Sequence, residues 1–491
     1  MREMVDTSKL EQSSELCVGA LSQAVLDDIA IYEQLRDKEP KILALTAELR
    51  MDTKFILMDL CTSFLAMCKA KEAYACRYHI KNLEAGIQEA YKLLFNYGKS
   101  QRYTVWKKIG STLSEEPVSY WSEQGKLMAD YQDITTKLTG LAGDEDDKQH
   151  RDITYHYDAD MRQVYEYTVA SNSMEDASKK LIAVMDVLGN MTTFCDDVEN
   201  CLRKNGTDTT VDVDNQNIDD SLHLSLIQYL NENKDLPIVL GDILKDVKPI
   251  DDYAHQMDVF SKMKGMTDEQ HIDLPEIDNV FTMLNLYMTV LFMRADMAAI
   301  TKSFLLSKTS GEAMLNMRRY IITITAAFGH LYGYSIDEKN RSIWQSVLKM
   351  ISDGDRDLLA KAAVIEVFLG KVVLKADMDL RTSYVHLLNN QNHKTNIPTI
   401  ISQLRQQNPM IEMQKVNLML QIIKRVMDFM QELMTKLAKQ AHESNEKSMA
   451  ALREQMLKVK AVAENDKCPD ILKDKILEII GMVQGCMGLQ L

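Results

Sequence analysis

Two short segments of the sequence place an arginine five positions before a histidine, the only polar pattern that recurs at matched places. Arg151 precedes His156 in the segment RDITYH, and Arg381 precedes His386 in RTSYVH. A histidine near its usual pKa of about 6.5 can accept or donate a proton near neutral pH. An arginine stays protonated and can bind two phosphate oxygens at once. The pair is suited to acid–base chemistry next to a phosphate group.

The spacing of the motif sets a geometric condition. Positions i and i+5 lie about 140° apart around a regular helix, so the arginine and histidine of one motif do not converge there. Either the helix is distorted or ends at the motif, or the two motifs act together across an interface. The structural alternative is that His156 is a hydrogen-bonded residue between two tyrosines and that Arg151 pairs with acids of the nearby run GDEDD.

The secondary structure around these residues is predicted to be helical. Apolar residues recur at spacings of three and four along almost the whole chain. Glycine and proline are scarce, with 19 and 8 among 491 residues, and no convincing run of hairpins is found. A heptad pattern of apolar residues runs through Val416, Leu420, Ile423, Met427, Met430, Met434 and Leu437. The chain is therefore predicted to be all-α.

One segment, 205–220, is polar, acidic and without helical periodicity, and is predicted to be a linker. It separates a predicted helical bundle at 1–204 from a second bundle at 221–440. Residues 441–491 are predicted to form a long C-terminal helical extension. The chain is long enough for each bundle to bury its own core.

The two predicted bundles share landmarks in the same order, which favours a diverged tandem duplication. Each landmark lies 230 to 242 residues after its counterpart; for the tryptophans, 344 − 106 = 238. The matched pairs are Arg77 with Arg319, Phe95 with Tyr332, Arg102 with Arg341, Trp106 with Trp344, Arg151 with Arg381 and His156 with His386. A duplication predicts that the two bundles superpose, with each pair on equivalent helices.

The first motif resembles the R-polar-x3-H motif of the HEPN (higher eukaryotes and prokaryotes nucleotide-binding) superfamily. The second motif keeps Arg381 and His386 but has Thr382 where that family prefers Asn, Asp or His. The resemblance covers the bundle pattern of each half and this short motif. It implies small helical bundles, common in bacterial toxins and antiviral defence, and metal-independent RNA cleavage between two facing domains that each contribute Arg and His.

Charge and cysteine content narrow the possible partners and cofactors. The net charge is −15, of which 17 acids and 7 bases in residues 201–280 supply −10. The other residues carry only −5, so a local basic cluster can still bind a polyanion such as RNA. The eight cysteines form no CxxC pair and indicate thiols in a reducing compartment. No cofactor or metal site is predicted, because the apparent P-loop at 98–100 and calcium loop at 212–223 lack required residues.

The predicted function is a metal-independent endoribonuclease in the cytoplasm, in a bacterial toxin or defence context. The alternative is a non-catalytic helical scaffold with a protein partner, which Thr382 and the acidity favour. A third hypothesis, insertion of the apolar stretch 280–306 into a membrane, is opposed by Arg294 and Asp296, because charges are costly inside a bilayer. The sequence does not predict an oligomeric state.

Overall fold

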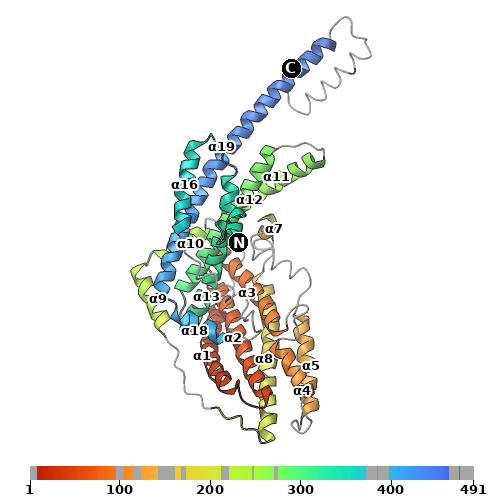
Figure 1. Cartoon of the computed structure of the whole chain (residues 1–491), viewed down its shortest axis with the longest axis vertical. Coiled ribbons are helices and arrows are strands. Elements are labelled where there is room, and N and C mark those ends of the chain that lie inside the picture. Colours follow the sequence, from red (N-terminus) through yellow and green to blue (C-terminus); the bar gives the residue numbers. More distant parts are fainter. Residues whose placement is uncertain are drawn as a thin grey trace. The chain divides into compact units, whose positions relative to one another are not determined.

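The computed structural model is helical in the part of the chain that it describes (Figure 1). The described residues are 8–95, 104–115, 123–141, 161–166, 173–211, 220–245, 248–269, 275–352, 354–371, 384, 397–463 and 475. Within these ranges every regular element is a helix and no strand occurs. The all-α prediction is confirmed.

The chain divides into two compact units. Unit 1 comprises Met1–Val259 and Leu284–Met427, and unit 2 comprises Phe260–Met283 and Asp428–Leu491. Most of both predicted bundles therefore belongs to unit 1. Below, "first half" means residues 1–204 and "second half" means residues 221–440, as parts of the sequence.

Helix α2 is the central element of the first half. It packs against α1, α3, α4 and α8, and 22 of its 29 residues are buried. Apolar residues occur on most faces of α2, so other helices must cover those faces. The helices of the first half are α1 (Ser8–Leu35), α2 (Lys41–Lys69), α3 (Ala73–Leu94), α4 (Val105–Glu115), α5 (Gln124–Gly140), α7 (Met161–Tyr165) and α8 (Met174–Lys204).

Helix α13 is buried to a similar degree in the second half. Of its 22 residues 19 are buried, and it packs against helices of both halves, including α1, α2, α9 and α18. The helices that begin in the second half are α9 (Ser221–Glu232), α10 (Leu236–Lys245), α11 (Lys248–Glu269), α12 (Pro275–Leu305), α13 (Ser310–Leu331), α14 (Ile336–Asn340), α15 (Ile343–Leu348), α16 (Arg356–Lys371), α18 (Ile397–Gln406) and α19 (Pro409–Ala463).

The predicted heptad pattern lies on α19, one helix of 55 residues. Within unit 1, its side chains Val416, Ile423 and Met427 are buried, as an apolar seam requires. Residues 440 and 441, the predicted boundary of the C-terminal extension, both lie inside this helix.

The two landmark tryptophans occupy comparable places in their halves. Trp106 lies on short helix α4, which follows α3 with its buried Tyr78; Trp344 lies on short helix α15, beyond α13 with its buried Tyr320. Both tryptophans are fully buried, and the Trp106 ring stacks on Tyr131 at 4.5 Å. The element order agrees with a duplication, which stays a prediction.

Helix α12 contains the apolar stretch noted in the sequence. Among the described residues, Asn279–Leu305 is the one helical segment long and apolar enough to cross a membrane. Within the most apolar window of that segment, 83% of the residues are buried inside the structure, and Asp296 is paired with Lys81. These are the features of a buried core helix.

Candidate functional site

The four predicted site residues, Arg151, His156, Arg381 and His386, lie outside the described residues. Two residues close to them in sequence are described. Met161, at the start of α7, comes five positions after His156, and Tyr384 comes two positions before His386. Both of these residues contact other helices.

A buried carboxylate on α2 joins the first half to the second. Asp59 Oδ2 lies 2.9 Å from Nη1 of Arg318, and Asp59 Oδ1 lies 2.6 Å from Nη2 of Arg319. The same Nη2 also donates to the main-chain carbonyl of Asp59. Both arginines belong to α13 and are buried. Two guanidinium groups thus neutralise and bind a largely buried carboxylate.

A second buried carboxylate makes the reciprocal connection from α12 to α3. Asp296 Oδ2 lies 2.7 Å from Nζ of Lys81, and the Tyr74 hydroxyl donates to Asp296 Oδ1 at 2.8 Å. Here the acid is in the second half and its partners are in the first. As at Asp59, each carboxylate oxygen has its own donor.

The reciprocity extends to an aromatic ring one helical turn before each acid. Phe55 lies under the guanidinium of Arg318, with 5.8 Å from the guanidinium carbon to the ring centroid. Phe292 packs on the ring of Tyr74 at 5.9 Å. The two Phe-x3-Asp patterns are separated by 296 − 59 = 237 residues, an offset within the range of the landmarks. An interface in which each partner presents the same elements to the other is typical of twofold arrangements.

The described neighbours of both motifs contact this interface. Arg318 Nε donates to the main-chain carbonyl of Tyr384 at 2.8 Å, while its Nη1 pairs with Asp59. The main-chain N–H of Met161 donates to Oδ1 of Asn285 on α12 at 2.9 Å. A residue beside the first motif is thus bound by the second half. A residue within the second motif is bound by an arginine that the first half holds.

The charge balance keeps Asp59 ionised. Burial alone would raise the pKa of Asp59, but the charges of Arg319 and Arg318, with their hydrogen bonds, outweigh it and hold that pKa below its ordinary value. The carboxylate stays charged near neutral pH and keeps both arginines in place.

A nearby histidine, His79, is kept in its neutral form, in contrast to the charged Asp59. Burial, reinforced by the charge of Arg319, lowers the pKa of His79 to about 3. Its Nε2 lies 2.8 Å from the Ser303 hydroxyl, and its Nδ1 has no hydrogen-bond partner among the described residues. A serine–histidine pair suggests a hydrolase, but without an acid at Nδ1 and with so low a pKa the ring is a weak base. The pair links α3 to α12 structurally.

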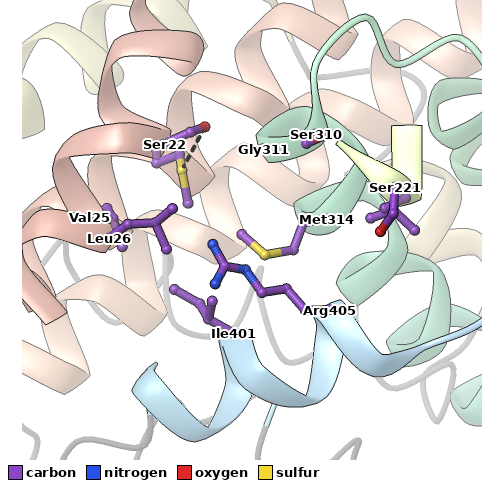
Figure 2. Close-up of a pocket in the computed structure, with 11 residues that line it drawn as sticks. Ser22, Val25, Leu26, Ser221, Ser310, Gly311, Met314, Ile401 and Arg405 are labelled. Atoms are coloured by element: carbon purple, nitrogen blue, oxygen red, sulfur yellow. Dashed lines mark hydrogen bonds between the residues drawn. The ribbon is translucent and has the colours of Figure 1, made fainter. Parts of the chain in front are cut away.

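A cavity beside α13 is too small to be a substrate site. Figure 2 shows it between α1, α13 and α18, with the Arg405 side chain pointing from α18 towards Met314. Its volume of about 30 Å³ holds roughly two water molecules, far less than a nucleotide needs. Among the described residues, no group of three or more His, Cys, Asp or Glu side chains could hold a metal ion.

The sequence patterns singled out the motifs but missed the residues that join the halves. Asp59, Asp296 and Arg318 sit inside apolar helices, where one charged residue does not reveal its partner. The available signal was the Phe-x3-Asp pattern, repeated at an offset close to that of the tryptophans. No protein-family model, no curated protein and no solved structure matches this chain.

Proposed function

We propose that this protein is a metal-independent endoribonuclease of the HEPN type, with a site to which both halves contribute. The observation that carries the proposal is the double contact of Arg318. This side chain binds Asp59 of the first half and the carbonyl of Tyr384, which lies within the second Arg-x4-His motif. The contact supports a motif that adjoins the interface between the halves.

A second contact between the halves supports the proposal. The main-chain N–H of Met161, which comes five residues after His156 in the sequence, donates to Oδ1 of Asn285 in the second half.

In the proposed reaction, a histidine removes the proton of a ribose 2′-hydroxyl. The oxygen attacks the adjacent phosphorus, and the bond to the 5′-oxygen of the next nucleotide breaks. A second histidine donates a proton to that leaving oxygen, and an arginine binds the phosphate oxygens as negative charge develops on them. On a regular helix, the arginine and the histidine of one Arg-x4-His motif point in different directions. A site built from two motifs is therefore the simpler arrangement.

The proposed location is the cytoplasm, and the proposed context is a bacterial toxin or defence system. The six described cysteines are free thiols, which supports a reducing compartment.

The test is incubation of the purified protein with total RNA, with and without EDTA. We expect cleavage that EDTA does not reduce. His156→Ala should lower the rate by about 10² to 10⁴, the usual contribution of a positioned acid or base. Arg151→Lys should also be damaging, because lysine keeps the charge but cannot bind two phosphate oxygens at once. His255→Ala, at an exposed position on α11, is the matched control and should leave the rate unchanged.

His386→Ala tests whether the second motif contributes. A loss equal to that of His156→Ala means a shared site, whereas near-normal activity means that the second half is a scaffold. Cleavage abolished by EDTA, or fully retained when both histidines are replaced, would refute the mechanism.

The second candidate function is a non-catalytic scaffold, favoured by exposed apolar side chains on α9 and α10. Leu224 and Ile227 on α9, and Ile238 and Val239 on α10, are each between 43% and 63% exposed. Neighbouring exposed apolar groups of this size are typical of protein-binding surfaces. If the wild-type protein does not cleave RNA, this surface becomes the first to test, with Leu224→Ser and Ile238→Ser.

A further inference from the structure

Two cysteine side chains from neighbouring helices meet in the first half. Sγ of Cys17 on α1 lies 3.8 Å from Sγ of Cys61 on α2, and one thiol can donate a hydrogen bond to the other. The two residues are 44 positions apart in the sequence, so their contact depends on the packing of α1 along α2. A disulfide bond is about 2.0 Å long, so the two sulfur atoms would have to approach each other by about 1.8 Å to form one.

The two thiols differ in their access to solvent. Cys17 is partly exposed, whereas Cys61 is only 5% exposed. An oxidant dissolved in water can therefore reach Cys17 before it reaches Cys61. The side chains that pack around the pair are all apolar: Val18, Leu21, Leu57 and Leu65.

The contact between the thiols also prepares Cys17 to react. The hydrogen bond from Cys61 stabilises the thiolate of Cys17 more than burial opposes it, and so lowers the pKa of Cys17 to about 7. The same hydrogen bond, together with burial, raises the pKa of Cys61. The thiolate is the nucleophilic form of cysteine, so Cys17 is the attacking residue of the pair. A partly exposed thiol of lowered pKa beside a second thiol is typical of redox-sensing cysteines.

We propose that Cys17 and Cys61 are a redox-sensitive pair, which hydrogen peroxide converts into a disulfide between α1 and α2. The Cys17 thiolate attacks one peroxide oxygen, the O–O bond breaks, and hydroxide leaves as Cys17 becomes a sulfenic acid. The Cys61 sulfur then attacks the Cys17 sulfur, and the S–O bond breaks as water leaves with the Cys61 proton. The hydroxide takes up the proton that Cys17 had released. Two thiols and one peroxide thus give one disulfide and two water molecules.

The disulfide would restrain a part of α1 that also contacts the second half. Two residues before Cys17, Glu15 lies 2.6 Å from Nζ of Lys308. Five residues after Cys17, Ser22 lies against Gly311 at the start of α13. Because a disulfide limits the freedom of the unfolded chain, oxidation should raise the urea concentration at the midpoint of unfolding.

The experiment treats the purified, reduced protein with one equivalent of hydrogen peroxide at pH 7 and analyses its unreduced tryptic peptides by mass spectrometry. We expect peptide 10–36, which contains Cys17, to be linked to peptide 55–69, which contains Cys61 and Cys68. The linked pair should weigh about 2 Da less than the two peptides together, because two hydrogen atoms are lost. Dithiothreitol should separate the peptides. Absence of this link in the wild type would overturn the proposal.

Variants show which cysteine of peptide 55–69 forms the link. Cys68→Ala, the matched control on the same helix, should keep the link to Cys17. Cys61→Ala should lose the link and leave a sulfenic acid at Cys17 that dimedone labels. A link that survives in Cys61→Ala would overturn the assignment of the pair.

Cys17→Ser, a change at a partly exposed position, is a second variant in case Cys61→Ala does not fold. It should lose both the link and the dimedone label, and its urea midpoint should not respond to peroxide. In the wild type the midpoint should rise on oxidation and return after dithiothreitol. A link that forms without any rise in the midpoint would overturn the stabilising effect on α1. None of these outcomes depends on the proposed ribonuclease function.

Discussion

Asp59 and His79 are both buried beside Arg319, and the surroundings of each favour a single protonation state. The arginines keep Asp59 charged, whereas burial and the same positive charge keep His79 neutral. Each preference predicts how one substitution changes the stability of the protein.

The first prediction concerns His79. Its pKa of about 3 in the folded protein lies below the usual value of about 6.5 for an unfolded chain, so below pH 6.5 the unfolded state binds a proton that the folded state does not. Its contribution is complete above pH 6.5 and is lost as the pH falls towards 3. Between pH 7.5 and 5, the free energy of unfolding of the wild type should fall by about 2 kcal/mol more than that of His79→Gln.

Urea unfolding at a series of pH values measures this difference. His255→Gln, at an exposed position, serves as the control and should retain the wild-type slope. The same pH slope in wild type and His79→Gln would contradict a neutral, buried imidazole.

The second prediction concerns Asp59. Asp59→Asn leaves Arg318 and Arg319 buried without a counter-charge, and loss of one partner from a buried ion pair costs about 3–5 kcal/mol. Asp133→Asn on α5 removes an exposed pair with Lys137 and should cost no more than about 0.5 kcal/mol. Urea unfolding at pH 7 measures both. Equal, small losses would mean that water reaches the Asp59 carboxylate.

At the scale of elements, local sequence pattern predicted the helices well and their pairing poorly. The apolar spacing in α19 identifies its seam because the period of 3.6 residues is a local property. Which helix meets the carboxylate of Asp59 depends on tertiary packing, and no local pattern contains it. The side-chain chemistry and spacing of the motif arginines and histidines predict a role but not which of them lie together. Their mutual arrangement therefore stays a prediction.

The approach of α13 to α1 gives the third prediction. A Cβ added to Gly311 would lie 1.7 Å from Oγ and 2.8 Å from Cβ of Ser22. Gly311→Ala should therefore destabilise the protein by about 1–3 kcal/mol, although alanine favours a helix more than glycine does. In a Ser22→Gly background the same change should be neutral or stabilising.

A double-mutant cycle measured by urea unfolding isolates this coupling. If Gly311→Ala has the same effect on the free energy of unfolding in both backgrounds, that result would contradict the close approach of α13 to α1.

At the scale of the molecule, the fourth prediction is that cutting the predicted linker does not separate the halves. The segment 205–220 contains aspartates but no lysine or arginine, so Asp-N can cut it where trypsin cannot. The Asp, Asn and Thr residues of 205–220 offer no apolar face to bury, so limited proteolysis should cut this segment first. The ion pairs at Asp59 and Asp296 should then keep the two fragments together.

Gel filtration of the cut protein in native buffer tests this expectation. Co-elution at the mass of the intact chain agrees with it. Separate elution, or cleavage elsewhere with an intact linker, would show that the linker or the interface is wrongly assigned.

The reciprocal pairs also have an evolutionary consequence. Asp59 of the first half pairs with arginines of the second half that lie some 260 residues later in the sequence (319 − 59 = 260). Asp296 of the second half pairs with Lys81 of the first half. A change at one member leaves a buried charge uncompensated, so selection acts on both members together. In homologous chains, neutral residues at the position of Asp59 should therefore accompany neutral residues at Arg318 and Arg319. Substitutions at the buried charged positions of one half should therefore be accompanied by compensating substitutions in the other half.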